Sequence, residues 1–446
     1  MKTIQAVARY FPENCGGIQT HLSELLPELE ALGVESKVVA AQEKPEADTY
    51  SYQGVEIYRY PAFPVPKPEP LHGGSGHGGF EYFAQWLKQQ KAEIYHQHQW
   101  EPKCGLAHLR LAKELGMGTV VSIRLPHPIC QRNTLMFEGK TACDGKLDLM
   151  RCSQCAGVPK NLPSTMIQAL SQVPISVSEK AKGKLGFLAL PAYIAERQKG
   201  LVEMAKYADR IVAMSQWVYD AIAINGIPEE KLFLLKHGIS ESLVKTTVSQ
   251  PRKADGILRI GFLGRWSPTK GIHVLVEAIK CLPTDAPVEL IIHGVPQDEP
   301  YRQRLMDRIG NDSRIRVANQ LKRDDISAAL SNYDVLAVPS QWLETGPMVV
   351  IEAHANGLPV VGSDLGGVAE KVTHGVDGLL VHPSDPKSWA EAFALLAKDS
   401  SLLDKLRQGI KPPRTISMEA ADSVTLYQRI LAEKSVKTAY QMASSL

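Results

Sequence analysis

The start of the chain alternates apolar runs with an amphipathic stretch. Residues 4–10 and 36–40 are apolar runs with the length of β-strands. Residues 18–32, between them, repeat leucine at intervals of three or four, which places one apolar stripe along a helix. The leucines are Leu22, Leu25, Leu26 and Leu29. Such a strand–helix–strand unit is typical of a parallel sheet covered by helices.

The alternation continues along the chain in two blocks. In the first block, strands are expected at 94–96, 119–123, 209–214 and 232–235, with a helix over 178–206. In the second block, strands are expected at 258–263, 288–293, 315–317, 335–338, 359–362 and 379–381. Helices are expected at 271–280, 301–310, 326–330, 349–356, 387–408 and 419–434. A Pro- and Gly-rich loop at 61–79 and a cysteine-rich segment at 127–160, with little regular structure, interrupt the pattern.

Polar residues around Pro251 separate the two blocks. We therefore expect a first domain over 1–245, a linker over 246–257 and a second domain over 258–418. Both domains are predicted to be α/β, each with a Rossmann-like parallel sheet.

Composition narrows the class of protein. The 446 residues include 50 basic and 48 acidic side chains, and a net charge of +2 argues against a nucleic-acid binder. No apolar run reaches about 18 residues, so no membrane-spanning helix is expected. Residues 1–9 fit a strand better than a signal peptide, which makes the cytoplasm the expected compartment.

One glycine motif is misleading. Gly74, Gly76 and Gly79 match the G-x-G-x-x-G pattern of dinucleotide-binding proteins. That pattern requires a strand before it and a helix after it, whereas prolines precede it here. We interpret the segment as a loop and expect no nicotinamide cofactor.

The most specific chemical feature is a pair of glutamates separated by seven residues. Glu344 and Glu352 flank a loop that follows the strand at 335–338 and opens a helix. Each carboxylate could accept hydrogen bonds from sugar or ribose hydroxyls, and the N–H groups at the helix start are suited to an anion. Those N–H groups belong to Gly346, Met348 and Val349. On its own, the pair fits a helix cap and a surface residue better.

Two cations strengthen the functional interpretation. Arg265 and Lys270 follow the strand at 258–263, at the edge where open parallel sheets bind ligands. Together they could hold a diphosphate and stabilise the charge that develops as it leaves, although either one alone fits a solvated surface residue. A Gly-rich turn at 362–367 would let the backbone approach a ligand closely.

Taken together, these segments resemble the retaining glycosyltransferases of family 4, which have the GT-B fold of two Rossmann-like domains facing across a cleft. The resemblance runs nearly end to end and rests on the order and spacing of several motifs. They are Gly16-Gly17-x3-His21, Gly264-Arg265 with Lys270-Gly271, Pro339-Ser340, the Glu344-x7-Glu352 block, Gly357-Leu358-Pro359-Val360-Val361 and Gly366-Gly367.

The resemblance implies roles for the residues of the second domain. Arg265 and Lys270 would hold the diphosphate of a UDP-, GDP- or ADP-sugar. Glu344 would bind the hydroxyls of the donor sugar, and Glu352 would bind the ribose. Transfer without a catalytic metal is also implied, which agrees with the lack of an Asp-x-Asp motif in the sequence. The anomeric configuration of the sugar would be retained.

For the first domain the resemblance implies less. Gly16 and Gly17 would bring backbone against the reaction centre, and the C-terminal segment 419–446 would return to this domain. Carbohydrate or lipid-linked acceptors would bind mainly here.

The sequence departs from the family after the strand at 119–123, where many relatives carry a His-Asp pair. Arg124 occupies that place, and arginine cannot act as a base because it stays protonated. Either Arg124 binds an anionic group or His127 serves instead, and a structural salt bridge explains Arg124 equally well. Strand alternation places His96 and His98 on one face, and we favour His98 for the site because it is nearer the strand end.

Four of the seven cysteines gather in the 127–160 segment. They are Cys130, Cys143, Cys152 and Cys155. The closing C-x-x-C has the spacing of a zinc knuckle, and four thiolates would complete a structural zinc site. Reduced thiols or a labile disulfide are equal alternatives, because the first spacing is irregular.

We therefore predict a glycosyltransferase of polysaccharide or glycoconjugate biosynthesis. The alternatives are a GT-B epimerase or phosphorylase, and a non-catalytic protein that binds nucleotide-sugars. Weak peripheral contact with the inner face of a membrane through Lys180, Lys182 and Lys184 is also conceivable, although a solvated face explains three lysines better.

Overall fold

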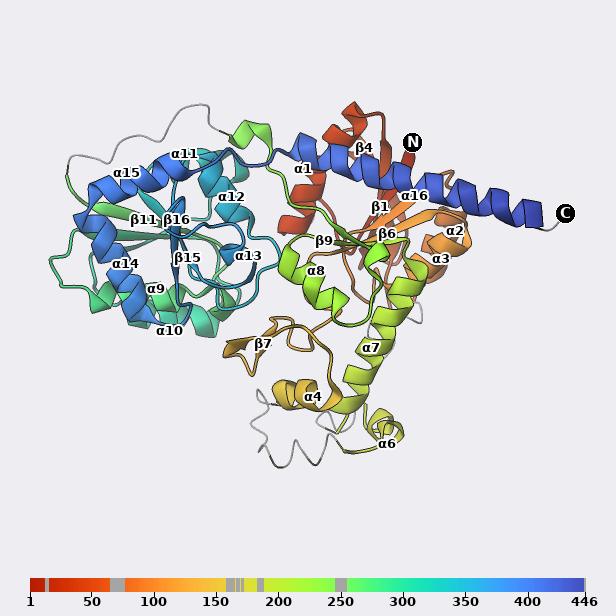
Figure 1. The fold of residues 1–446 in the computed structure, drawn as a ribbon, viewed down its shortest axis with the longest axis horizontal. Coiled ribbons are helices and arrows are strands. Elements are labelled where there is room, and N and C mark those ends of the chain that lie inside the picture. The colour runs from red at the N-terminus through yellow and green to blue at the C-terminus, as the bar shows by residue number, and fades with distance from the viewer. Residues whose placement is uncertain are drawn as a thin grey trace. The chain divides into compact units, whose positions relative to one another are not determined.

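The computed structural model describes residues 1–12, 16–64, 77–157, 165, 169, 172–182, 188–244 and 255–444. The chain forms two compact units (Figure 1): unit 1 is Met1–Lys236 with Ile416–Leu446, and unit 2 is His237–Thr415. Each unit contains one large, mainly parallel sheet with helices, which confirms the predicted α/β class. None of the described helices combines the length and the apolar composition that crossing a bilayer would take.

Unit 1 is built on eight strands in the order β10-β9-β6-β5-β1-β2-β4-β3. All neighbours are parallel except the β3–β4 hairpin. The strands are β1 Lys2–Val7, β2 Glu35–Gln42, β3 Asp48–Tyr52, β4 Val55–Pro61, β5 Ile94–Gln97, β6 Gly118–Ile123, β9 Arg210–Ala213 and β10 Leu232–Leu234. Because β2 and β5 lie on opposite sides of β1, the sheet changes its direction of growth there, which is where open α/β sheets bind ligands.

The helices of unit 1 follow the predicted alternation and add elements that it missed. They are α1 Gly17–Ala31, α2 Phe80–Gln89, α3 Leu106–Glu114, α4 Leu149–Gly157, α6 Ile175–Lys180, α7 Leu190–Tyr207, α8 Gln216–Ala223, η3 Glu229–Lys231 and α16 Ile416–Ser444. The leucine stripe of α1 is buried as expected: Leu22 and Leu26 pack with residues of β2 and β4, while Leu25 and Leu29 pack with residues of α16.

The C-terminal helix α16 therefore belongs to the core of unit 1. It lies beside α1 and β6 (Figure 1, blue), and Ala420, Tyr427 and Ile430 are buried there. The first unit is thus made of two segments of the chain that are far apart in sequence.

Unit 2 contains six parallel strands in the order β13-β12-β11-β14-β15-β16. They are β11 Leu258–Leu263, β12 Val288–His293, β13 Ile315–Ala318, β14 Val335–Val338, β15 Val360–Ser363 and β16 Gly378–Val381. The helices are η4 Glu241–Leu243, η5 Pro268–Lys270, α9 Ile272–Cys281, α10 Glu299–Ile309, η6 Arg323–Asp325, α11 Ile326–Leu330, α12 Met348–Ala355, α13 Gly366–Ala369, α14 Pro386–Lys398 and α15 Ser400–Gly409. The sheet changes direction between β11 and β14, because β12 and β13 lie on one side and β15 and β16 on the other.

The structure corrects the predicted domain boundary. The first unit ends at Lys236 rather than at residue 245, because Ile239 and Leu243 pack against Ile351 and other apolar residues of unit 2. Most of the predicted linker, 246–257, lies outside the described residues.

Three further expectations were wrong in detail. The segment 127–160 is more regular than predicted, since it contains the hairpin of β7 Met136–Phe137 and β8 Thr141–Ala142 as well as α4. The helix expected over 387–408 is two helices, because the Asp399 side chain accepts a hydrogen bond from Leu402 N–H and begins a new one. The helix expected over 178–206 starts only at Leu190 and is preceded by α6. In the misleading glycine motif, Gly79 caps α2, and Gly74 and Gly76 lie outside the described residues.

Candidate functional site

A partly buried ion pair of unit 2 lies at the point where its sheet changes direction. Lys270 Nζ lies 2.6 Å from Glu344 Oε1, and Ser340 Oγ donates to the same carboxylate oxygen. Lys270 follows β11, while Ser340 and Glu344 follow β14, the neighbouring strand. We call these three residues the β11–β14 cluster. Its position is the one at which open parallel sheets bind ligands.

Backbone contacts join the two loops that carry the cluster. The Gln341 N–H donates to Thr269 O at 2.8 Å. Gly271 has φ +72°, and a β-carbon there would lie 1.8 Å from the carbonyl oxygen of Pro339. Only glycine therefore fits beside Lys270, and the close approach of the two loops fixes where the lysine lies.

The carboxyl group of Glu344 is buried but charged. Burial alone would raise its pKa, but Lys270 and the hydrogen bonds from Lys270 and Ser340 outweigh that effect and leave the pKa below its ordinary value. Lys270 also lies 6.0 Å from the centre of the Trp342 ring. At neutral pH the cluster thus combines a carboxylate with an ammonium group.

The Gly-rich turn after β15 contacts this loop directly. Gly367 N–H donates to Glu344 O at 2.9 Å, and a β-carbon on Gly367 would lie 2.5 Å from that oxygen. Gly366 has φ +51° and lies against Leu343. Glycine at these two positions thus lets the turn approach the Glu344 loop closely, and that the turn also admits a ligand stays a prediction.

The second glutamate of the motif is buried on α12. The Arg323 guanidinium donates to Glu352 Oε1. Sequence reasoning missed Arg323, which lies in η6, 29 residues before its partner, in a segment without a motif. Each glutamate of the motif thus has its own cation: Lys270 pairs with Glu344, and Arg323 pairs with Glu352.

The other site residues predicted in unit 2 are near Lys270 or Glu344 in the sequence. Arg265 is exposed, and its guanidinium has no hydrogen-bond or ion-pair partner among the described residues. Met348 and Val349 are the first two residues of α12, so their N–H groups have no acceptor within that helix. Gly346 lies against the His237 ring, where a β-carbon would approach Cδ2 to 2.6 Å.

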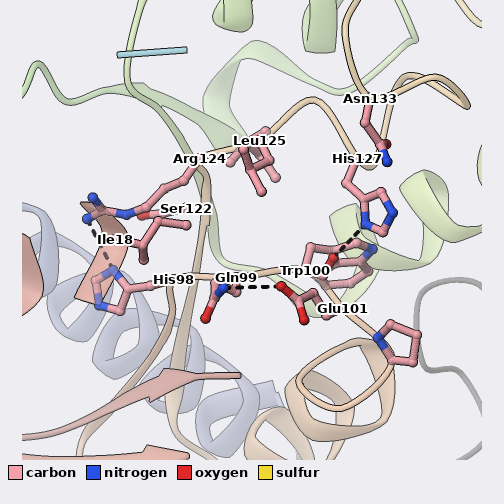
Figure 2. A pocket seen from close by; sticks show the side chains of 12 residues that line it. Ile18, His98, Gln99, Trp100, Glu101, Ser122, Arg124, Leu125, His127 and Asn133 are labelled. Carbon is pink, nitrogen blue, oxygen red and sulfur yellow. Dashed lines mark hydrogen bonds between the residues drawn. The ribbon is translucent and has the colours of Figure 1, made fainter. Parts of the chain in front are cut away.

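Unit 1 has a pocket of about 450 Å³ at the carboxyl ends of β5 and β6 (Figure 2). We call it the unit 1 pocket. Its lining residues are Ile18, His98, Gln99, Trp100, Glu101, Pro102, Ser122, Ile123, Arg124, Leu125, His127 and Asn133. Three of the predicted residues, His98, Arg124 and His127, thus line one cavity.

Arg124 is buried between two histidines. Its Nη1 lies 3.2 Å from His21 Nδ1 and its Nη2 lies 3.3 Å from His98 Nδ1. On the other side of the first ring, His21 Nε2 lies 2.9 Å from Glu419 Oε2 of α16. The charge of Arg124 is thus connected through a ring to a buried carboxylate that no local motif would reveal.

His98 is held in place rather than left open as a base. Its Nε2 lies 2.7 Å from Gln5 Oε1, and its Nδ1 faces Arg124. Burial, and then the neighbouring His96 and Arg124, hold the pKa of His98 well below its ordinary value. A neutral ring that donates to Gln5 and accepts from Arg124 satisfies this geometry. His96 stacks on it at 4.0 Å between centroids, as strand alternation predicts.

Polar groups line the more open part of the unit 1 pocket (Figure 2). The His127 Nδ1 lies 3.1 Å from Trp100 O, and Gln99 Nε2 donates to Glu101 Oε1 at 3.1 Å. Gln99 Oε1 also accepts from the Ala8 N–H at 2.7 Å. Carboxylate, amide and imidazole groups beside apolar walls suit a polyhydroxylated ligand.

Gly16 and Gly17 begin helix α1. Gln19 Oε1 accepts from the Gly16 N–H at 3.1 Å, and Gln19 Nε2 donates to Gln99 at 3.2 Å, which ties the helix start to the pocket wall. A β-carbon on Gly17 would meet nothing within 4 Å. Among the residues that the structure describes, none fills the space in front of Gly17.

The other predicted residues lie apart from the unit 1 pocket. The four cysteines line a different cavity of unit 1. Among the lysines, Lys182 pairs with Glu196 at 2.8 Å, which favours a structural interpretation, and Lys184 lies outside the described residues.

Family models match both halves of the chain. Residues 16–152 match the glycosyl transferase 4-like domain, and residues 245–411 match the glycosyl transferases group 1. D-inositol 3-phosphate glycosyltransferase of Corynebacterium glutamicum is 32% identical over 190 residues, covering 40% of this chain and 44% of that protein. The match spans less than half the length of this curated relative. The chain belongs to the group 1 glycosyl transferases.

Solved structures agree with this assignment at the level of the fold. Anabaena HepE, solved with UDP and glucose, has a TM-score of 0.63 at 15% identity over 96% of this chain and 99% of that chain. Sucrose-phosphate synthase of Thermosynechococcus elongatus has a TM-score of 0.64 at 18% identity, over 97% and 99%. The fold is GT-B, as the sequence motifs predicted.

Proposed function

We propose that this protein transfers a sugar from a nucleotide-sugar to an acceptor with retention of configuration. The observation that carries the proposal is the β11–β14 cluster: Lys270 and Glu344, 2.6 Å apart, at the ligand-binding edge of the unit 2 sheet. In a protein of this family, that edge is where a nucleotide-sugar would bind.

The cluster provides groups for both parts of the donor. Lys270, together with the exposed Arg265, offers positive charge to the diphosphate as the bond to the sugar breaks. Glu344 is a fixed carboxylate that would accept hydrogen bonds from sugar hydroxyls and stabilise an oxocarbenium-like transition state. Glu352, oriented by Arg323, would bind the ribose. Cations of the chain would do the work of a metal, so we expect added Mg²⁺ or Mn²⁺ to leave the rate unchanged.

We assign the acceptor to the unit 1 pocket. Its volume of about 450 Å³ and its polar lining suit a carbohydrate or another polyhydroxylated head group, free or lipid-linked. None of the six described cysteines is in a disulfide, which agrees with a reducing compartment, and we therefore place the reaction in the cytoplasm.

The test is a donor panel of UDP-, GDP- and ADP-sugars, assayed for hydrolysis and for transfer. UDP-glucose is the first arm because HepE was solved with UDP and glucose, and an inositol phosphate belongs among the acceptors because of the curated relatives. We expect turnover with one donor class. We also expect Glu344→Gln to lower it by about a hundredfold or more while the fold is kept.

The matched control is Glu299→Gln, which changes an exposed glutamate of α10 in the same unit. Its rate should equal that of the wild type. If the wild type binds a nucleotide-sugar but turns over none of the panel, or if Glu344→Gln is fully active, a non-catalytic binding protein becomes the better interpretation.

A further inference from the structure

The cysteine-rich segment of unit 1 encloses a small cavity that the proposed transfer reaction does not use. Cys130 lies in the loop after β6, Cys143 directly follows β8, and Cys152 and Cys155 lie on α4. Together with Gln131, Arg132, Lys146, Arg151 and apolar residues, these four cysteines line a cavity of about 20 Å³. That volume accommodates a single atom or ion. In Figure 1 this segment, with β7 and α4, lies beside α7, against which α4 packs.

Every one of the four sulfur atoms accepts a hydrogen bond from nitrogen. The donors are the N–H of Leu135 to Cys130 (3.4 Å), Glu138 to Cys155 (3.1 Å) and Asp148 to Cys152 (3.5 Å), and the Arg151 guanidinium to Cys143 (2.9 Å). A neutral thiol is a weak acceptor, whereas a thiolate is a strong one. Cys143, Cys152 and Cys155 also direct Sγ at an oxygen, namely Asp144 Oδ1 (3.7 Å), Lys146 O (3.9 Å) and Met136 O (3.6 Å), as neutral thiols do. When a metal displaces these thiol protons, the four N–H donors are in place to stabilise thiolates, the form in which cysteine binds metal.

Positive side chains surround the cysteines. Arg132, Lys146 and Arg151 line the same cavity, and Arg197 of α7 is buried nearby, donating to Gln131 at 2.9 Å. Four thiolates with one divalent cation carry a net charge of −2, which these cations can balance. Asp144 already pairs with Arg151, so Arg132 and Lys146 are the lining cations left to face the sulfur atoms.

The backbone of the segment also needs a source of order. Asn133, Leu135 and Glu138 have φ of 58°, 50° and 53°, a region that costs a residue other than glycine on the order of 1–2 kcal/mol. The hairpin itself has only two residues in each strand. Such strain persists where other interactions fix the chain, and a bound metal supplies them.

We propose that Cys130, Cys143, Cys152 and Cys155 bind one structural zinc ion. Zinc fits four thiolates in tetrahedral geometry, and a cavity for one ion is too small for an iron–sulfur cluster. Among the described residues, no three of these sulfur atoms lie within 4.8 Å of one another. Since sulfur atoms around zinc lie about 3.8 Å apart, binding draws the four side chains together and compacts the segment.

The zinc site steadies one wall of the unit 1 pocket. His127 and Asn133, which line the pocket, lie three residues before and after Cys130. This consequence, unlike the zinc site itself, rests on the proposed function. Loss of zinc should raise the KM for the acceptor at least about tenfold and leave hydrolysis of the donor unchanged.

The first experiment measures metal in the full chain, purified under reducing conditions, by elemental analysis. We expect about one zinc and no iron per chain. Cys152→Ser and Cys155→Ser should each lose the zinc. The matched control is Cys281→Ser, an exposed free cysteine of unit 2, which should keep it. The proposal would be overturned if the wild type contains no zinc even after incubation with zinc and reductant. It would also be overturned if the protein contains iron in place of zinc.

A second measurement works even when a variant does not fold. Titrating the wild type with a thiol-specific mercurial should release its zinc as four thiols react. Cobalt-substituted protein should show thiolate-to-metal charge transfer and the intense visible bands of tetrahedral Co²⁺. Octahedral spectra, or zinc release without thiol reaction, would place the ion elsewhere. Because zinc is counted without catalysis, a zinc-containing but inactive protein would contradict only the proposed function.

Discussion

The β11–β14 cluster of unit 2 and the unit 1 pocket are both built at the carboxyl ends of neighbouring parallel strands, but different forces hold them. In unit 2, backbone contacts join short loops, and the charged groups meet across neighbouring strands. In unit 1, Arg124 and two histidines are linked by side-chain hydrogen bonds, one of which joins His21 to Glu419, 398 residues later. A local site of this kind leaves motifs in the sequence, and a long-range network does not.

The largest expected effect is in unit 2, where the contribution of the ion pair to stability can be distinguished from its contribution to activity. Lys270→Met leaves the buried carboxylate of Glu344 without its cation, which we expect to cost about 3–5 kcal/mol of stability and nearly all transfer activity. The double variant Lys270→Met/Glu344→Gln should regain most of the stability and none of the activity. Urea unfolding followed by hydrogen exchange in unit 2 measures the first effect, and initial rates measure the second.

If Lys270→Met leaves the stability unchanged, the buried carboxylate of Glu344 does not need the lysine as its cation. The short distance between the two groups would then contribute little to stability. Recovery of activity in the double variant would instead remove both residues from the reaction.

The corresponding substitution in unit 1 is at a residue far along the sequence from those that line the unit 1 pocket. Glu419→Gln on α16 removes the carboxylate behind His21, and we expect unit 1 to lose about 3 kcal/mol. Hydrogen exchange should rise in β1, β5 and α1 and stay unchanged in the sheet of unit 2. Glu433→Gln, on the same helix but near the surface, is the control. Equal effects of the two variants would show that α16 acts only by packing.

A fall in pH should also distinguish the two units by their stability. Burial, and then Arg124, lower the pKa of His96 to about 3 from an ordinary value of 6.5. The unfolded chain therefore takes up the proton first, so this stabilisation is complete above pH 6.5 and is lost as the pH falls toward 3. Between pH 7 and pH 5 the loss is about 2 kcal/mol for this one histidine.

The measurement is the urea midpoint of unit 1 at both pH values, in the wild type and in His96→Gln. The variant should lose about 2 kcal/mol less than the wild type, because glutamine does not titrate. Parallel losses in the two proteins would place the proton elsewhere in the network.

The smallest expected effect concerns Gly17. Because a β-carbon there meets no described atom within 4 Å, Gly17→Ala should change stability by less than about 0.5 kcal/mol. If the backbone at Gly17 approaches the reacting groups, the same methyl group should lower transfer about tenfold. Rates equal to those of the wild type, measured beside Gly17→Ala unfolding curves, would remove Gly17 from the reaction centre.

Much of unit 2 could be predicted from its sequence. Apolar periodicity located β11, β12, α11 and β14 at their observed bounds, because buried parallel strands are short apolar runs between polar loops. The meeting of Lys270 with Glu344 followed from parallel topology, which brings the ends of neighbouring strands to one edge. Arg323 escaped notice because its contact with Glu352 depends on where η6 lies, and a single arginine leaves no pattern.

Unit 1 was harder to predict for a physical reason. His98 was expected in the site, but that its two ring nitrogens would face Gln5 and Arg124 depends on how strands far apart in sequence pair. The cysteine segment appeared irregular because strands of two residues carry no periodicity. The end of the first domain was predicted at residue 245, because the polar residues that follow it suggested a linker. The observed boundary is at Lys236, because Ile239 and Leu243 pack in unit 2.

Because α16 returns to unit 1, the two units should not fold in the usual order on the ribosome, which is N-terminal unit first. Unit 2 is one uninterrupted stretch and can fold as soon as residue 415 has left the exit tunnel. Unit 1 begins earlier but must wait, since Leu25, Leu29 and His21 find their partners on α16, which is synthesised after unit 2. Until then Leu25 and Leu29 lack their partners on α16 and are exposed to water and to other chains. The half of the protein that is translated first is therefore the half that needs protection longest.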